Sequence, residues 1–156
     1  YTTRAPRAGE VPGQDYYFIS PEEFAECEAR GEFVESVELD GVNYGIKEAE
    51  IDELFRQKKF VYLILNAKGA KILKDKYGNL VSRIFIYIDK NLVIERQRKA
   101  GASEELIKQH LRHYEEDMAY KVECKYSFEN IDLAHTVFAV SNIIDAYMNR
   151  GLVEKD

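Results

Sequence analysis

The sequence has only two cysteines, no long apolar run and no excess of positive charge, and each shortage argues against a class of protein. Cys27 and Cys124 lie far apart, which is typical of reduced thiols rather than a disulfide scaffold, and neither has a metal-binding spacing. The longest apolar run, residues 60–65, is far too short to span a bilayer. A net charge of −6 argues against general affinity for nucleic acid. We therefore expect a cytoplasmic protein with no membrane and no nucleic-acid partner.

The dipeptide Gly-Lys is also absent, so the chain as written has no G-x-x-x-x-G-K-[ST] loop to hold the phosphates of ATP. There is no initiator methionine, and Tyr1 already belongs to a structured motif. We therefore expect the chain to begin inside a longer protein. Length and a hydrophobic content of 46% predict one domain with its own core.

The pattern of apolar residues alternates between strands and helices, which indicates an α/β fold with a parallel sheet. Strands are predicted at 16–19, 33–39, 42–44, 60–65, 83–88 and, weakly, within 121–129. The wholly apolar segment 60–65 is expected to be buried on both faces. Helices are predicted at 21–30, 47–57, 67–77, 89–99, 103–120 and 131–148, the last with an apolar stripe along one side.

The first sixteen residues, YTTRAPRAGEVPGQDY, place Arg4 and Arg7 ahead of a Pro/Gly-rich turn that leads to Tyr16. Each arginine offers a planar fork of donors that suits phosphate oxygens, and the prolines and glycines bend the connecting loop. On spacing alone, this pattern fits a phosphate clamp and an exposed basic turn equally well.

The stretch resembles the start of the nucleotide-monophosphate-binding segment of guanylate kinases. Their signature runs Thr-Thr-Arg-x-Pro-Arg-x-Gly-Glu-x-x-Gly-x-Asp-Tyr, and every fixed position is present. The resemblance continues through Gly31–Glu35 and Asn43–Gly45 and persists more weakly to the carboxy end. It implies the three-layer α/β fold of P-loop nucleoside-monophosphate kinases, with a parallel core sheet. Residues 1–156 would form a single domain, with a small mixed-β GMP-binding subdomain at 1–46, a core at 47–88 and 121–156, and a helical lid at 89–120.

The same resemblance implies a GMP site. Its phosphate would be held by Arg4, Arg7, Tyr16 and Tyr44, and its base by Glu35 and Asn66. Guanine presents adjacent donors at N1 and N2, which a carboxylate can accept together. We expect Asn66, which stands where the family has an aspartate, to accept a bond through its amide oxygen.

Other positions depart from the family. Ile46 replaces a hydroxyl residue that contacts the base, and Ile64 replaces an aspartate near the metal and phosphates. In the lid, Lys99 and His110 replace arginines that neutralise the migrating phosphoryl group.

The resemblance therefore implies catalytic roles for cations of the lid: Lys99, Arg96, Arg98 and His110. Asn130 matches an asparagine on the adenine side of ATP. Mg²⁺ with ATP is implied by the family, but no metal ligand is identified in this chain.

The leading function is transfer of a phosphoryl group from ATP to GMP, with these two nucleotides as partners and no oligomeric state indicated. A rival is a non-catalytic module that keeps the clamp to bind GMP or a phosphorylated partner. The features that favour it are the missing phosphate loop and four residues: Ile46, Ile64, Lys99 and His110. A third is a kinase for another nucleoside monophosphate, suggested by Ile46 and Asn66 but opposed by Glu35.

Overall fold

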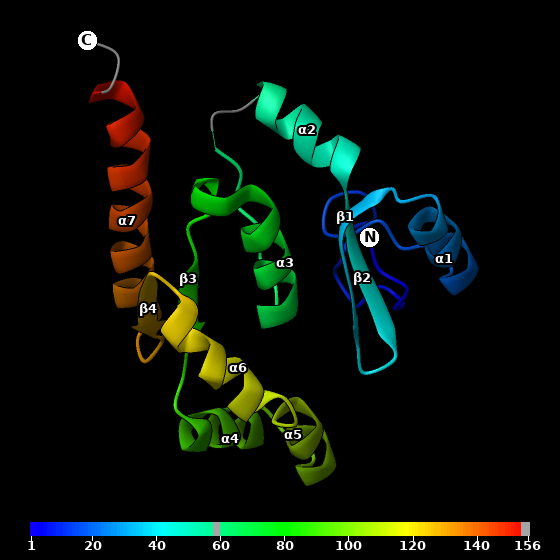
Figure 1. The fold of residues 1–156 in the computed structure, drawn as a ribbon. Helices are drawn as coiled ribbons and strands as arrows, with labels where there is room; N and C mark the ends of the chain where they lie inside the picture. Colours follow the sequence, from blue (N-terminus) through cyan, green and yellow to red (C-terminus); the bar gives the residue numbers. More distant parts are fainter. Residues whose placement is uncertain (58–59, 154–156) are drawn as a thin grey trace. The chain divides into compact units, whose positions relative to one another are not determined.

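The computed structural model describes residues 1–57 and 60–153 (Figure 1). The chain forms two compact units, Tyr1–Leu80 and Val81–Asp156, and each is described by itself. The predicted division into GMP-binding, core and lid parts stays a prediction. In the part of the chain that the structure describes, no helix is long and apolar enough to cross a membrane.

The first unit consists of a β-hairpin and three helices that follow the sequence pattern closely. Asp40 and Gly41 form the hairpin turn with φ values of 51° and 78°, as a tight turn between twisted strands requires. Ser20 caps the first helix by accepting a hydrogen bond from the Glu23 N–H at 3.1 Å. The elements are α1 (Pro21–Ala29), β1 (Phe33–Leu39), β2 (Val42–Lys47), α2 (Glu48–Gln57), α3 (Ala67–Tyr77) and the 3-10 turn η1 (Gly78–Leu80).

Thr2 joins three separate stretches of this unit. It forms a parallel bridge with Phe18 and an antiparallel bridge with Tyr44, and its side chain is completely buried. The segment 16–19 forms two isolated bridges, Phe18 with Thr2 and Tyr16 with Pro12, instead of the predicted strand, because each neighbouring stretch pairs with it through a single residue. These bridges bring together the residues next to Thr2, Phe18 and Tyr44 in the sequence.

The core of the first unit lies between the hairpin and the helices that follow it. Val34, Ile51 and Leu73 are buried together, and a ring of partly buried residues packs against them: Ile46, Leu65 and Tyr77. Burial of such side chains is the main favourable term in folding. This core fixes α3 against β1 and β2.

The predicted strand at 60–65 is wrong for this structure, since residues 60–66 form no strand. A strand needs a hydrogen-bonded neighbour, and no described segment pairs with this one. The expectation of burial on both faces also fails, because Tyr62 and Ile64 are 87% and 92% exposed.

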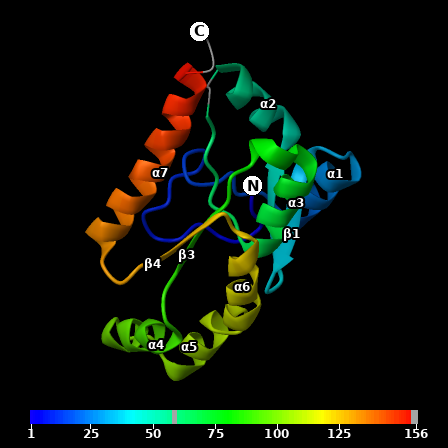
Figure 2. The same ribbon diagram turned by 60° about the vertical axis from the view of Figure 1, so that its left-hand side comes forward.

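The second unit is built on β3 (Ile84–Tyr87) and β4 (Tyr126–Glu129), which pair in parallel with Ile84 opposite Tyr126 and lie side by side in Figures 1 and 2. This pair confirms the predicted parallel element. Its other elements are α4 (Lys90–Lys99), α5 (Glu104–His110), α6 (Tyr114–Tyr120), the 3-10 turn η2 (Lys121–Glu123) and α7 (Leu133–Val153).

Two predictions for this unit need correction. The helix expected at 103–120 is divided into α5 and α6, and α6 begins where the Tyr114 hydroxyl donates to the Ile88 carbonyl at 2.8 Å. Residues 111–113 form a turn between the two helices. The apolar stripe of α7 is present but largely uncovered, with Leu133 and Val137 69% and 55% exposed.

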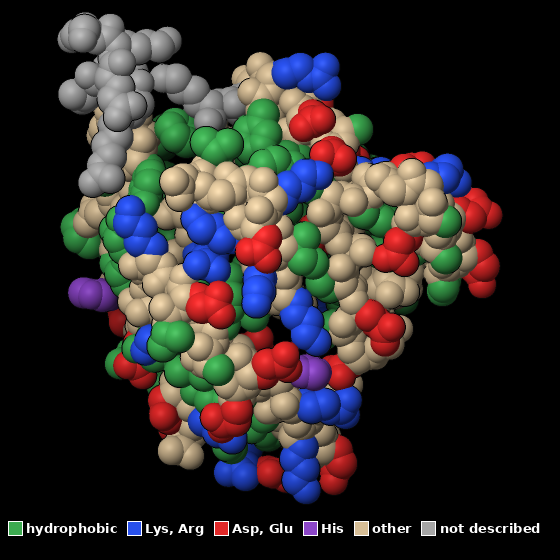
Figure 3. All heavy atoms as spheres, in the orientation of Figure 1, with side chains coloured by type: hydrophobic (Ala, Val, Ile, Leu, Met, Phe, Trp, Pro, Cys, Tyr) green, Lys and Arg blue, Asp and Glu red, His purple; other side chains and the backbone are tan. Residues whose placement is uncertain are grey.

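Charged side chains of both signs are interspersed over the face seen in Figure 3. This mixture is consistent with a chain that carries 22 basic and 28 acidic residues. Both cysteines are free thiols, as expected from their spacing.

Candidate functional site

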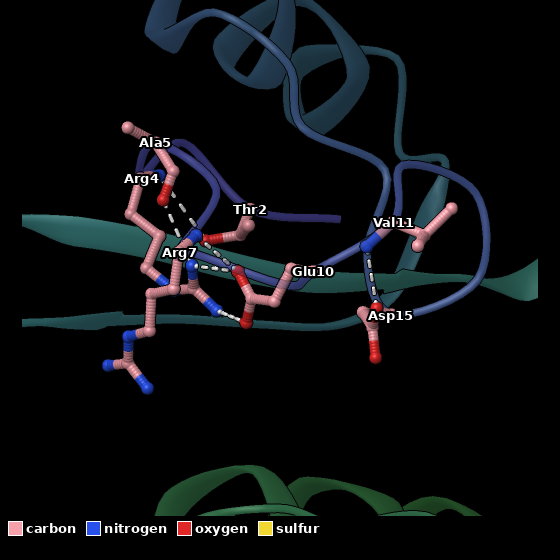
Figure 4. A network of polar contacts seen from close by, with 7 residues as sticks. All are labelled: Thr2, Arg4, Ala5, Arg7, Glu10, Val11 and Asp15. Carbon is pink, nitrogen blue, oxygen red and sulfur yellow. Dashed lines mark hydrogen bonds and ion pairs between the residues drawn. The ribbon is translucent and has the colours of Figure 1, made fainter.

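Arg4 is held by a bidentate ion pair with Glu10 across the Pro/Gly-rich loop. Its two terminal nitrogens lie 2.7 and 2.6 Å from the two carboxylate oxygens, and the first also donates to the Ala5 carbonyl at 2.9 Å. Figure 4 shows the guanidinium facing this carboxylate. Only 13% and 19% of the two side chains are exposed, and Glu10 raises the pKa of the guanidinium. The guanidinium of Arg4 is therefore held in a fixed place within an ion pair of no net charge, and it keeps N–H donors to spare.

Aromatic rings surround the Arg4 guanidinium. Its central carbon lies 5.0 Å from the ring centre of Tyr16 and 5.6 Å from that of Phe18, within the range of cation–π attraction. Tyr16 and Tyr44 meet edge to face at 6.1 Å, and the Tyr44 hydroxyl adds to the rise in the pKa of Arg4. Three of the predicted phosphate-binding residues thus lie together, through the pairing of Thr2.

Arg7 behaves differently from Arg4. Its backbone N–H donates to Glu10 Oε2 at 2.7 Å, while its side chain extends away from this carboxylate (Figure 4). Glu10 therefore holds the loop through both arginines. It binds the side chain of Arg4 and the backbone N–H of Arg7. The Arg7 guanidinium is exposed and available to an anion.

Glu35 is buried in β1. The pairing register of β1 and β2 shifts between Phe33 and Glu35, and two consecutive residues, Val34 and Glu35, are buried there. Glu35 is only 3% exposed, and burial raises the pKa of its carboxyl group to about 7. Among the described residues, no hydrogen bond or ion pair reaches this carboxylate.

Asn66 lies beside Glu35 at the start of α3. It is the N-cap of the helix, and its amide oxygen accepts a hydrogen bond from the Gly69 N–H at 2.9 Å. A Cβ atom at Gly69 would be 2.4 Å from Glu35 Oε1 and 3.4 Å from Asn66 Oδ1, so both side chains converge on this glycine. The oxygen expected to meet the base already serves as a helix cap. A base contact by Asn66 stays a prediction.

Ile46 stands directly opposite Glu35 in the hairpin. Cross-strand partners share one face of a sheet, so this position adjoins the carboxylate. The isoleucine packs against the core of Val34, Ile51 and Leu73. Its side chain supplies core contacts and no hydrogen bond.

The predicted cations of the lid all lie on α4 and α5, and each has a local partner. Arg98 forms two hydrogen bonds with Glu104, at 2.7 and 2.9 Å, and Lys99 pairs with Glu95 at 2.6 Å. The remaining two contacts are Arg96 donating to the Ile131 carbonyl at 2.7 Å and His110 Nδ1 lying 3.2 Å from Gln97 Oε1. Arg98 and Lys99 are 58% and 74% exposed.

Asn130 follows β4 and has a backbone N–H that donates to the Tyr87 carbonyl at 2.7 Å. Its buried amide oxygen has no hydrogen-bond partner among the described residues. In residues 1–57 and 60–153, no group of three or more His, Cys, Asp or Glu residues is placed to hold a metal ion.

Sequence reasoning missed two residues of this site. Glu10 could have been identified from the sequence, because a glutamate six residues after Arg4 in a tight loop can reach back to pair with the arginine. Gly69 could also have been identified, because a glycine inside a helix is unfavourable by about 1 kcal/mol relative to alanine, and so points to a packing requirement.

Known proteins provide the comparison. The family model described as guanylate kinase matches residues 1–147. Guanylate kinase of Chlamydia felis is 32% identical over 154 residues, covering 97% of this chain and 74% of the relative. That of Symbiobacterium thermophilum is 36% identical over 148 residues, covering 93% and 69%. The crystal structure of guanylate kinase from Anaplasma phagocytophilum matches with a TM-score of 0.74 and 28% identity, over 94% of this chain and 72% of that one.

Proposed function

The chain belongs to the guanylate kinase family and has its nucleoside-monophosphate-kinase-like α/β fold, and we propose that it transfers a phosphoryl group from ATP to GMP, giving ADP and GDP. One observation carries this proposal: an anchored arginine and a buried, unpartnered glutamate occur in the same compact unit. The arginine suits a phosphate, and the glutamate suits a base that has two adjacent hydrogen-bond donors.

The phosphate of GMP would bind at Arg4, Arg7, Tyr16 and Tyr44. Three guanidinium N–H groups of Arg4 are engaged by Glu10 and Ala5, and an arginine has five, so donors remain for phosphate oxygens. The exposed Arg7 side chain would close on the dianion from solvent. The tyrosine hydroxyls would add direction, while the arginines supply most of the charge.

Glu35 would select the base. Its ionised carboxylate accepts the N1–H and N2–H donors of guanine together, which satisfies a group that is otherwise buried without a partner. Adenine presents an acceptor at N1, so it would face the carboxylate with repulsion. The site therefore favours GMP over AMP.

The lid cations would neutralise charge on the transferred group. Arg98 and Lys99 would leave their glutamates for the phosphoryl group, because exposed ion pairs contribute little to stability. Arg96 and His110 would join them from the Ile131 carbonyl and the Gln97 amide oxygen. Phosphoryl transfer depends on positioning and on stabilising charge over the equatorial oxygens. Closure of this part over the nucleotides would also exclude water.

ATP would meet Asn130, whose unpartnered amide oxygen suits an N–H donor such as the amino group of adenine. Mg²⁺ bound with ATP would supply neutralisation of the phosphate charge. Ile64 offers no carboxylate for such an ion, and no residue of this chain is assigned as its ligand.

A coupled assay of ADP release with GMP, AMP, UMP and CMP as acceptors tests the proposal. We expect turnover above the rate of ATP hydrolysis with GMP and little with the other three. GMP binding by calorimetry without turnover would contradict the kinase assignment and leave a binding module. Preference for another acceptor would contradict the base assignment alone.

A further inference from the structure

Gly69 lies in direct contact with the Glu35 carboxylate. A Cβ atom built on this glycine would be 2.4 Å from Glu35 Oε1 and 3.1 Å from the carboxyl carbon. The first distance is shorter than real Cβ contacts and the second is unusually tight, so any residue with a Cβ would force the carboxylate to move. The contact is with the functional end of the glutamate, not with its aliphatic stem.

Backbone conformation does not explain the glycine. Gly69 is the third residue of α3, and its φ is not positive, so alanine could adopt the same backbone and would favour the helix. Its N–H donates to the Asn66 cap, which any residue except proline could also do. The close approach of Glu35 is therefore the feature that requires the absence of a side chain.

The carboxylate is held from two sides. The register shift in β1 places Glu35 on the buried face of the hairpin, and the first turn of α3 limits how far its oxygens can advance. With 3% exposure and no hydrogen bond from a described residue, the side chain has no polar contact of its own to fix its position. Packing against Gly69 supplies that restraint.

We propose that Gly69 is a positioning residue for base selection. Because glycine has no side chain, the Glu35 carboxylate can occupy the place from which it meets the base. This inference rests on the proposed function, in which Glu35 accepts two donors of guanine. Two parallel hydrogen bonds tolerate little displacement, so a shift of the carboxylate weakens both. The phosphate contacts of Arg4 lie on a different loop and stay intact.

The test is Gly69→Ala in the full chain, alone and with Glu35→Ala, measured by calorimetry and steady-state kinetics. Alone, we expect at least a 10-fold rise in Kd and KM for GMP, little change in kcat, and unchanged competition by ribose 5-phosphate, which has no base. In the Glu35→Ala background, the second substitution should change GMP affinity less than two-fold. Asp75→Ala, at an exposed position of the same helix, serves as the matched control and should leave all of these values unchanged.

Thermal unfolding separates this contact from the function. Gly69→Ala should lower Tm when Glu35 is present and raise it when residue 35 is alanine, since only the helix propensity then changes. Unchanged GMP affinity in Gly69→Ala, while Glu35→Ala weakens it, would overturn the positioning role. Unchanged affinity in Glu35→Ala would instead overturn the base assignment of the proposed function.

Discussion

Arg4 and Arg98 each meet a glutamate through two short hydrogen bonds, yet the two pairs lie in different surroundings. The Arg4–Glu10 pair is 13% and 19% exposed and lies against the rings of Tyr16 and Phe18. The Arg98–Glu104 pair is 58% and 54% exposed. The same kind of ion pair is thus shielded from solvent in the first unit and exposed to solvent in the second.

The difference matters for a kinase because its two halves have different tasks. Binding the acceptor phosphate benefits from a group that is already in place, since little freedom is lost when the ligand arrives. A cation that follows a migrating phosphoryl group must exchange partners, and an exposed pair allows this. The shielded Arg4–Glu10 pair therefore suits the binding of a phosphate. The exposed Arg98–Glu104 pair of α4 and α5 suits an arginine that changes its partner.

The largest effect is expected from Arg4→Ala. It removes the anchored charge, and GMP affinity should fall about 100-fold, because charge-assisted bonds contribute roughly 1.5–3 kcal/mol each. The loss should be greater at low salt, where the wild-type attraction is stronger. Calorimetry at two salt concentrations measures this.

Arg30→Ala is the matched control, since Arg30 is an exposed arginine of the same unit that pairs with Glu26 and Glu32. It should bind GMP as the wild type does. Equal losses in both variants would mean that net charge matters and that Arg4 has no special place.

Glu35→Gln should have the next largest effect. Glutamine keeps the shape of the side chain but replaces one acceptor by a donor that faces the donors of guanine. GMP affinity should fall about 30-fold, corresponding to roughly 2 kcal/mol for the lost charge-assisted contact. The affinity for AMP should not fall, and competition between the two nucleotides measures the ratio. A parallel loss for AMP would point to general damage of the site.

The pH dependence of GMP binding sharpens the same point. Burial raises the pKa of Glu35 to about 7, so the acceptor carboxylate is largely ionised at pH 8 and largely protonated at pH 6. GMP affinity should therefore decrease about 10-fold between pH 8 and pH 6 beyond the change seen with Glu35→Gln. Identical pH profiles for the two proteins would show that Glu35 is not the acceptor.

Arg98→Ala should have a smaller and different effect. If its guanidinium turns to the transferred group, kcat should fall about 5-fold, while the Kd of GMP should stay the same because the proposed acceptor residues belong to the other unit. Lys108→Ala, an exposed cation on α5, controls for net charge. A higher Kd for GMP with normal kcat would contradict this assignment.

The smallest effect is expected from Glu104→Gln, which breaks the exposed pair without touching a nucleotide. Thermal unfolding should shift by less than about 2 °C, since exposed ion pairs contribute little to stability. A large loss of stability would show that α4 and α5 depend on this pair, and that Arg98 is not free to exchange.

Most local structure was predictable from the sequence, because it depends on neighbours in the chain. The Asp40-Gly41 turn, the Ser20 cap and the helix at 67–77 follow from residue types whose backbone preferences act over a few positions. Segment 60–65 was not predictable in this way. Its apolar composition favours a strand, but a strand forms only where another segment supplies hydrogen bonds.

The residues of the candidate site were named from the sequence, whereas their arrangement was not. The family signature identified Arg4, Tyr16 and Tyr44, and their grouping follows from bridges that Thr2 makes to distant segments. The ion pair with Glu10 and its shielding by rings required the folded loop.

The sequence by itself determined the family, the hairpin, the helices and the identity of the charged groups, since these depend on residue type and local spacing. Only the tertiary structure decided how those groups behave. Burial at a register shift raises the pKa of Glu35 to about 7, and the Glu35 carboxylate lies where a side chain at position 69 would begin. Burial and close contact arise between segments that are far apart in the chain, so no local pattern encodes them.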